Sequence, residues 1–160
     1  QLAGYVTRDS SLPEAMLNLP VSEMDNDLFG VLAGVLAIAI KEHDKYADLH
    51  YYASRTHDRL GDIERASSHA MAAIDINPRY VKARMQMADL CDRTARNEQA
   101  VEHITRAIEY GADWPDVHLH AADLLNKCKR TQHAKQHLLR ALELKPDYTQ
   151  AHEALASLAA

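Results

Sequence analysis

Four aromatic residues recur at one fixed interval and impose a repeating architecture on the chain. Tyr46, Tyr80, Trp114 and Tyr148 each lie 34 residues after the previous one. A fixed period of about 20–50 residues is the signature of stacked supersecondary units. With the aromatic as its last residue, the first repeat is 47–80, the second is 81–114 and the third is 115–148. One such unit cannot bury its apolar face alone, so neighbouring repeats must stack.

Residues inside each repeat follow the helical period. Small residues hold the eighth, twentieth and twenty-seventh positions, which are Ser54, Ala88 and Ala122, then Ala66, Ala100 and Ala134, then Ala73, Ala107 and Ala141. Small residues at facing positions let two antiparallel helices approach closely. Asn77-Pro78 and Lys145-Pro146 predict helix ends, because a proline disfavours helical geometry in the residue before it. The pattern predicts two helices in each repeat.

These residues resemble the tetratricopeptide repeat family, whose unit is a 34-residue helix–turn–helix. The resemblance covers residues 47–160 and implies an all-α fold, a right-handed superhelical solenoid of antiparallel helix pairs. The chain departs from the family pattern where Ala95 and Lys129 replace a turn glycine that is kept as Gly61. The predicted organisation is an N-terminal helical region with a degenerate half-repeat at 1–46, three repeats at 47–148, and at 149–160 the first helix of a further repeat or a capping helix.

Residues 1–46 fit the repeat less well. We expect a short helix ending near Asn18 and a longer apolar helix from residues 22–25 to about His43. The apolar run 28–40 is shorter than the roughly 20 residues that span a membrane, although Gly30 and Gly34 have the spacing of a membrane dimer face. We therefore expect a buried helix, covered on one flank by the first repeat and on the other by residues 1–20 or a partner.

The two ends of the chain bear on its assembly. At 149–160, Leu155 and Leu158 belong to a helix without a second half to shield it. Exposed apolar ends allow a homo-oligomer or contact with a further domain. The chain does not begin with Met and stops within a repeat, so we expect it to be a fragment of a longer protein.

In the tetratricopeptide family the first helix of each pair lines the concave groove. The resemblance implies that the groove side chains are Asp48, Tyr51, Arg55, Asp58 and Arg59, then Lys82, Met85, Asp89, Asp92 and Arg93, then Asp116, Leu119, Asp123, Asn126 and Lys127. All except Asp48, Asp58, Asp92, Asp116 and Asn126 are predicted to contact a partner.

The groove residues predict what kind of partner would bind. Tyr51, Met85 and Leu119 form an apolar stripe flanked by charges, of which more are acidic than basic. We expect an extended peptide or a helix with apolar anchors and some basic residues. Asp89 and Asp123 would repel a carboxylate, which argues against the subset of the family that grips C-terminal carboxylates. Alternatively, charges four residues apart, such as Asp123 and Lys127, stabilise a helix by ~0.3 kcal/mol without any ligand.

The net charge and the motifs of the sequence restrict the classes of function that we expect. Eighteen Lys and Arg against 23 Asp and Glu give a net charge of −5, which argues against a nucleic-acid partner. The sequence has no phosphate-binding glycine loop, no nucleophile elbow and no His-Glu-x-x-His, so we expect no enzymatic activity and no cofactor. Two cysteines and no visible signal peptide favour a cytoplasmic protein. We predict a protein–protein interaction scaffold. The alternatives are the non-catalytic domain of a larger enzyme, such as a glycosyl- or methyltransferase, and a small secretion-type chaperone.

Ten histidines are many for 160 residues, and six of them fall at two repeat positions. His50, His118 and His152 hold the fourth position, and His69, His103 and His137 hold the twenty-third. The second set predicts a column along the second helices. This column can be a pH-responsive seam, and His133 and His137 can chelate zinc or nickel. Duplicated ancestry explains the pattern without either role, and we expect no metal, because successive repeats lie about 10 Å apart.

Overall fold

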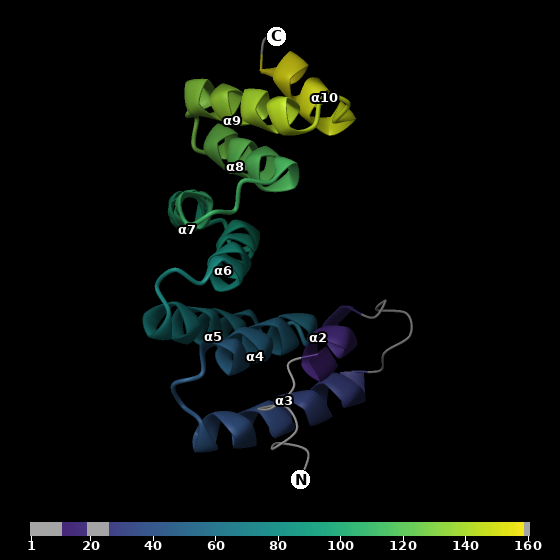
Figure 1. Ribbon diagram of the computed structural model, residues 1–160, viewed down its shortest axis with the longest axis vertical. Coiled ribbons are helices and arrows are strands. Elements are labelled where there is room, and N and C mark those ends of the chain that lie inside the picture. The colour runs from purple at the N-terminus through teal and green to yellow at the C-terminus, as the bar shows by residue number, and fades with distance from the viewer. Residues whose placement is uncertain (1–10, 19–25, 159–160) are drawn as a thin grey trace. The chain divides into compact units, whose positions relative to one another are not determined.

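The computed structural model describes residues 11–18 and 26–158, and its regular structure there is entirely helical (Figure 1). The helices are α2 (Ser11–Asn18), α3 (Asn26–Glu42), α4 (Ala47–Arg59), α5 (Ile63–Ile76), α6 (Val81–Arg93), α7 (Asn97–Glu109), α8 (Pro115–Lys127), α9 (Thr131–Leu144) and α10 (Thr149–Ser157). No strand occurs within these two ranges. The all-α prediction is confirmed.

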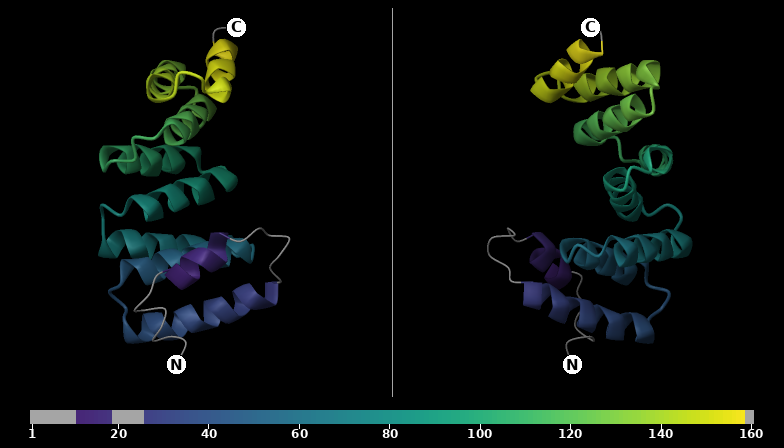
Figure 2. Two further views of the ribbon diagram at one scale, coloured as in Figure 1. Left: turned by 45° about the vertical axis from the view of Figure 1, so that its right-hand side comes forward. Right: turned by 180° about the vertical axis from the view of Figure 1, so that it is seen from behind.

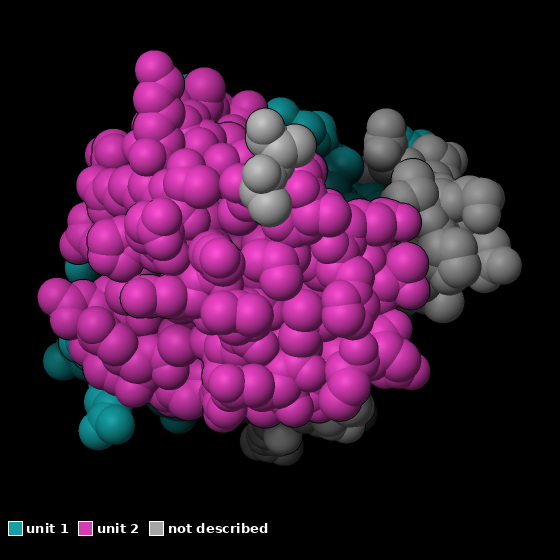
Figure 3. Space-filling model, turned by 90° about the horizontal axis from the view of Figure 1, so that it is seen from above, with its two compact units in different colours: residues 1–86 teal, residues 87–160 magenta. Residues whose placement is uncertain are grey.

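The chain divides into two compact units, which Figure 3 colours separately. The N-terminal unit, residues 1–86, contains α2 to α5 and the first part of α6. In it α4 packs against α2, α3 and α5. The C-terminal unit, residues 87–160, contains the rest of α6 and α7 to α10, and in it α8 packs against α7 and α9, and α9 against α10. No helix in the described part of the chain combines the length and apolar character needed to cross a membrane.

Alanines at the facing positions explain how closely the paired helices pack. The alanines that are completely buried include Ala66, Ala73, Ala100, Ala107, Ala134 and Ala141. A methyl group is the smallest side chain that still fills an interior, so helices with alanine at the contact approach at the short end of the usual 8–10 Å range. Because these positions recur in all three repeats, the sequence pattern and the packing agree.

The turn inside each repeat has the same backbone conformation, whichever residue occupies it. Gly61 has a φ of 76°, Ala95 of 57° and Lys129 of 59°. This left-handed region costs a residue with a Cβ roughly 1–2 kcal/mol, whereas glycine adopts it freely. Hydrogen bonds close the turn, as where the Arg130 amide donates to the Leu125 carbonyl at 2.9 Å. The second and third repeats therefore keep the turn at some cost in stability.

Prolines and one glycine end the second helices. Asn77 and Lys145 have extended backbones with ψ of 93° and 92°, and each precedes a proline, as the sequence predicts. In the second repeat Ala112 replaces that proline and is completely buried. Gly111, with a φ of 107°, turns the chain there instead.

The two helices expected before the first repeat are present as α2 and α3. Expectations for residues 1–10 and 19–25 lie outside the described residues. α3 buries Phe29 and Leu36 on the flank that packs against α4. Leu28, Val31 and Ile38 on its second flank are exposed, so cover of that flank by a partner stays a prediction.

Candidate functional site

Helix α2 packs on α4, the first helix of the first repeat (Figure 2). Two predicted groove residues of α4, Arg55 and Arg59, contact it. The carbonyl oxygen of Leu17 accepts hydrogen bonds from Nη2 of Arg55 at 3.4 Å and Nη2 of Arg59 at 3.0 Å. Carbonyls in the last turn of a helix have no partner within it, and cations there also complement the helix dipole. The Leu17 side chain is 0% exposed. The two arginines therefore hold the end of α2 on this face.

Tyr51 and Lys82 take part in the same arrangement. Nζ of Lys82 lies 3.1 Å from the Glu14 carboxylate, whose hydrogen bond raises the pKa of Lys82. Tyr51 is 7% exposed, packs against the ring of Tyr80, and lies under the Arg55 guanidinium at 5.9 Å. The expected open apolar stripe does not extend to Tyr51, because its ring belongs to the core of the N-terminal unit.

Three further predicted residues lie along α6. Met85 is half-buried, whereas Asp89 and Arg93 are exposed. The Asp89 carboxylate lies 3.4 Å from Nδ1 of His120 on α8. Their contact with a partner stays a prediction.

A pocket of about 420 Å³ opens beside α8 in the C-terminal unit. We call it the α8 pocket, and its lining residues are Asp116, Leu119, His120, Ala122, Asp123, Asn126, Leu138, Gln150, Ala154, Ser157 and Leu158. Four of them, Asp116, Leu119, Asp123 and Asn126, belong to the implied groove positions of the third repeat. The structure thus brings Leu119 and Asp123, both predicted to contact a partner, into one concave surface with α10.

Carboxylates dominate the charge next to the pocket. Nζ of Lys127 lies 2.8 Å from Asp123 and 2.7 Å from Asp92. Burial opposes the charge of Lys127, but the two carboxylates outweigh this effect and raise its pKa. The helix-stabilising pair that the sequence predicted between Asp123 and Lys127 is therefore present. One ammonium group shared by two carboxylates leaves this surface acidic.

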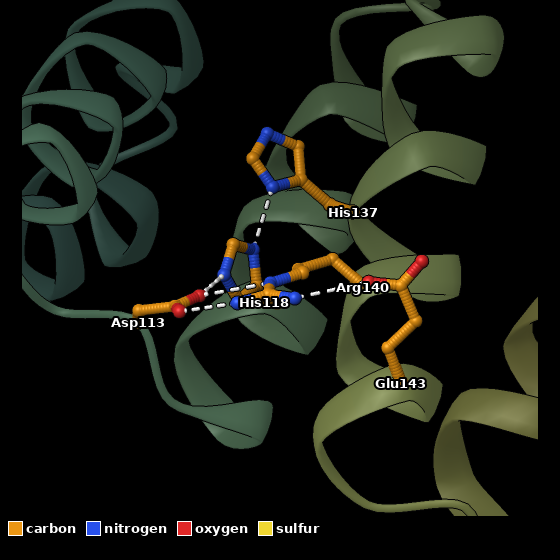
Figure 4. A network of polar contacts seen from close by, with 5 residues as sticks. All are labelled: Asp113, His118, His137, Arg140 and Glu143. Carbon is orange, nitrogen blue, oxygen red and sulfur yellow. Dashed lines mark hydrogen bonds and ion pairs between the residues drawn. The ribbon is translucent and has the colours of Figure 1, made fainter.

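A buried histidine network lies at the start of α8 (Figure 4). His118 is 4% exposed, with Nδ1 2.9 Å from Nδ1 of His137 and Nε2 2.8 Å from the Asp113 carboxylate. A carboxylate only accepts, so Nε2 of His118 donates, and one of the two Nδ1 atoms must donate to the other. Arg140 binds Asp113 as well, and its hydrogen bond, followed by that of His118, lowers the pKa of Asp113 to about 2.

The first repeat contains a second histidine pair. Nδ1 of His50 lies 3.1 Å from Nδ1 of His69, and the ring of His57 stacks on His69 with centroids 5.5 Å apart. Burial lowers the pKa of His69 to about 4, and the neighbouring charges of His50 and His57 add to this effect. Since a second proton would repel the first, the three rings favour the neutral state.

Sequence reasoning missed these pairs, because it assigned the fourth and twenty-third positions to separate columns. In an antiparallel helical hairpin, the repeat positions of any two residues that face each other add up to nearly the same number. The small residues at positions eight and twenty already indicated a sum of 28, which places position four opposite position twenty-three or twenty-four. His133 and His137 were the candidate chelate, but Nδ1 of His137 is engaged by His118. Within residues 11–18 and 26–158, no group of three or more His, Cys, Asp or Glu is arranged to hold a metal ion.

The tetratricopeptide repeat profile matches residues 47–80 and 115–148, which are the first and third repeats. A comparison with curated protein sequences finds no match.

Several solved structures are similar to this chain. YrrB, described as a TPR protein with an unusual peptide-binding site, is 19% identical with a TM-score of 0.72, over 79% of this chain and 65% of YrrB. TTC0263, a thermophilic TPR protein of Thermus thermophilus, is 19% identical with a TM-score of 0.68, over 99% of this chain and 87% of that protein. The first TPR of Spaghetti (RPAP3), bound to the HSP90 peptide SRMEEVD, is 16% identical with a TM-score of 0.65, over 71% and 90% of the two chains.

At these identities the likeness shows the fold, which is an all-α solenoid of helix pairs. The match to the repeat profile and the similarity to these structures both indicate tetratricopeptide repeats. Residues 47–80 and 115–148 match the tetratricopeptide repeat, and the chain has the fold of helix pairs seen in TPR proteins.

Proposed function

We propose that the chain is a protein-interaction scaffold that holds a partner peptide or helix in the α8 pocket. The observation that carries the proposal is the pocket itself, whose volume of about 420 Å³ suits a short segment of a partner. Buried Ala122 and Leu138 line it, and half-buried Leu119 and Leu158 present apolar surface to whatever enters. Peptide binding by YrrB and by the first TPR of RPAP3 supports this use of the fold.

The charges around the α8 pocket favour a partner with a basic residue beside an apolar anchor. Asp116 and Asp123 line the pocket, and the nearby ammonium of Lys127 is shared between Asp123 and Asp92. Complementary charge steers a partner and selects against the wrong one. The peptide SRMEEVD, with three acidic residues, is therefore the opposite of what we expect here.

A random peptide library selected on the chain tests the proposal. We expect enriched peptides with an aliphatic or aromatic residue next to Lys or Arg. Leu119→Ala should weaken a selected peptide about tenfold, since burying a leucine side chain stabilises a complex by roughly 1.5–3 kcal/mol. The matched control is Leu139→Ala, which truncates an exposed leucine of α9 that does not line the pocket. Enrichment of acidic peptides, or equal binding by the two variants, would contradict the proposal.

Partner contacts by Met85, Asp89 and Arg93 are a second part of the proposal. Met85→Ala should weaken the binding of a partner, and unchanged binding would contradict this part of the proposal. We also propose a cytoplasmic location, because Cys91 and Cys128 are free thiols, as cysteines of reducing compartments are. Cell fractionation tests this location, and recovery of the protein outside the cytoplasm would contradict it.

A further inference from the structure

Helix α3 presents an apolar face to solvent. Leu28 is 41% exposed, Val31 58% and Ile38 56%, and together they are three of the eight large hydrophobic residues that are exposed in the described part of the chain. Single exposed apolar side chains are ordinary, but several on one helix mark an interaction surface. The opposite face of α3 buries Phe29, Leu32, Leu36 and Ala39, so the helix is apolar all round and only half covered.

Two glycines lie in the middle of this exposed face. A Cβ built at Gly30 or Gly34 would meet nothing within 4 Å, so neither glycine makes room for another part of the chain. Glycine inside a helix costs roughly 0.5–1 kcal/mol relative to alanine. A glycine on a helix surface allows the backbone of a second helix to approach closely. Nothing else among the described residues uses that space.

The exposed face of α3 is complementary to itself about Gly34. Counting outward from Gly34, small Gly30 and large Ile38 lie four residues to either side, and large Val31 and small Ala37 lie three to either side. Seven residues away are Asp27 on one side and Lys41 on the other. In an antiparallel pair of these helices that crosses at Gly34, the levels three and four residues from the crossing each combine a large residue with a small one, and the level seven residues away combines opposite charges.

We propose that α3 pairs antiparallel with α3 of a second copy of this chain. Ile38 then lies level with the partner's Gly30, Val31 with the partner's Ala37, and Lys41 with the partner's Asp27. A parallel pair would instead place Ile38 beside Ile38 of the partner subunit and Lys41 beside the partner's Lys41. Size and charge therefore both select the antiparallel, two-fold symmetric arrangement. No residue of α3 lines the α8 pocket, so this proposal does not depend on the proposed function.

Sedimentation of the 160-residue chain over micromolar concentrations measures the association. The mass should rise from 17.9 kDa toward twice that value. Gly34→Leu places a side chain at the crossing point and should weaken the dimer at least about tenfold. The monomer should tolerate it, because a Cβ at this position meets nothing within 4 Å and leucine favours the helix more than glycine does. Ser68→Leu, which also places a leucine at an exposed position of a helix, α5, is the matched control and should dimerise normally.

Cysteine cross-linking tests the orientation, in a Cys128→Ser background. Gly34→Cys should form a disulfide with its own copy, since the crossing brings the two backbones close. Gly30→Cys alone should not form a disulfide with its own copy. A mixture of Gly30→Cys and Ile38→Cys chains should form a disulfide between the two variants. A chain that stays monomeric and does not cross-link at Gly34→Cys would overturn the proposal. Self-cross-linking of Gly30→Cys would overturn the antiparallel arrangement.

Discussion

The first and third repeats share the same repeat pattern, but the face of the first helix is covered in one and open in the other. In the first repeat, the α4 face is covered by α2, whose Leu17 carbonyl is held by Arg55 and Arg59. In the third repeat, the α8 face opens into a pocket that contains Leu119 and Asp123. Equivalent repeat positions thus stabilise the fold in one copy and are available for a partner in the other. What covers a helix, and not its place in the repeat, decides its role.

The histidine pairs of these two repeats differ in the same instructive way. Both join the fourth and twenty-third positions through their Nδ1 atoms. In the third repeat the carboxylate of Asp113 accepts a hydrogen bond from Nε2 of His118. In the first repeat a third ring, His57, stacks on His69 and disfavours a proton. The same pair therefore has different neighbours in the two repeats.

The largest expected difference is in the stability that is lost when a leucine at each of the two faces is truncated. Leu17→Ala should destabilise the N-terminal unit by about 2–4 kcal/mol, because it leaves a cavity under α2. Leu119→Ala should cost less than about 1 kcal/mol, because Leu119 is only half-buried. Hydrogen exchange of peptides from α4 and α8 measures the two effects separately. Equal losses would show that the two faces are not covered differently.

The next largest effect should come from acid, which acts on the first repeat through His69. The folded-state pKa of His69 is about 4 against 6.5 for an ordinary histidine, so the unfolded chain binds more protons below pH 6.5. The stability that neutral His69 contributes is complete above pH 6.5 and is lost as the pH falls to 4, by roughly 1–2 kcal/mol for a half-buried ring. Urea unfolding at pH 7 and pH 5 measures the loss, and His69→Leu should make it smaller.

The third repeat should respond over a wider range of pH. Burial lowers the pKa of His137, so the third repeat also loses stability below pH 6.5. The pKa of Asp113 is lowered to about 2 from 3.8, so its contribution is present above pH 3.8 and lost as the pH falls to 2. Fluorescence of Trp114, the single tryptophan, reports this unit. Asp113→Asn should remove the loss below pH 4, and an unchanged profile would contradict the role given to Asp113.

Substitutions in the turns of the first and third repeats should change the free energy of unfolding by about 1 kcal/mol, in opposite directions. Lys129→Gly should stabilise the third repeat by about that amount, because glycine relieves the left-handed backbone. Gly61→Ala should destabilise the first repeat to a similar extent. Thermal unfolding measures both. Lys135→Gly, within α9, is the control and should destabilise, since glycine there only weakens the helix.

The smallest effect should come from the ion pairs. Lys82→Ala removes the contact with Glu14 and should cost no more than about 0.5 kcal/mol, because both side chains are largely exposed. Lys127→Ala removes a contact with two carboxylates and should cost slightly more. Urea unfolding at low and high salt measures both, since salt screens exposed pairs. A loss of several kcal/mol for Lys82→Ala would mean that this pair alone holds α2 in place.

Much of the fold was predictable, because it depends on local periodicity. Alanines at fixed positions indicated which helix faces meet, and the prolines after Asn77 and Lys145 indicated where helices end. The left-handed turns at Ala95 and Lys129 were harder to foresee, because neither residue favours that conformation. There the packing of the two helices determines the backbone and overrides the preference of the residue.

The candidate site was only partly predictable. The positions of Leu119 and Asp123 followed from the repeat, but their pocket also needs α10, which comes from the incomplete fourth repeat. The anchoring of Arg55 and Arg59 needs α2, which lies in an earlier segment without the repeat pattern.

By itself, the sequence determined an all-helical chain of 34-residue hairpins with known inner faces, because each hairpin needs only contacts between residues close in sequence. Tertiary structure alone decided that α2 covers one face, that α8 and α10 leave another open, and that histidines nineteen residues apart form pairs. The physical reason is distance along the chain. Periodicity describes how a helix is oriented toward its neighbours in sequence, whereas the cover of a face depends on which remote segment gains most by burying its own apolar residues there.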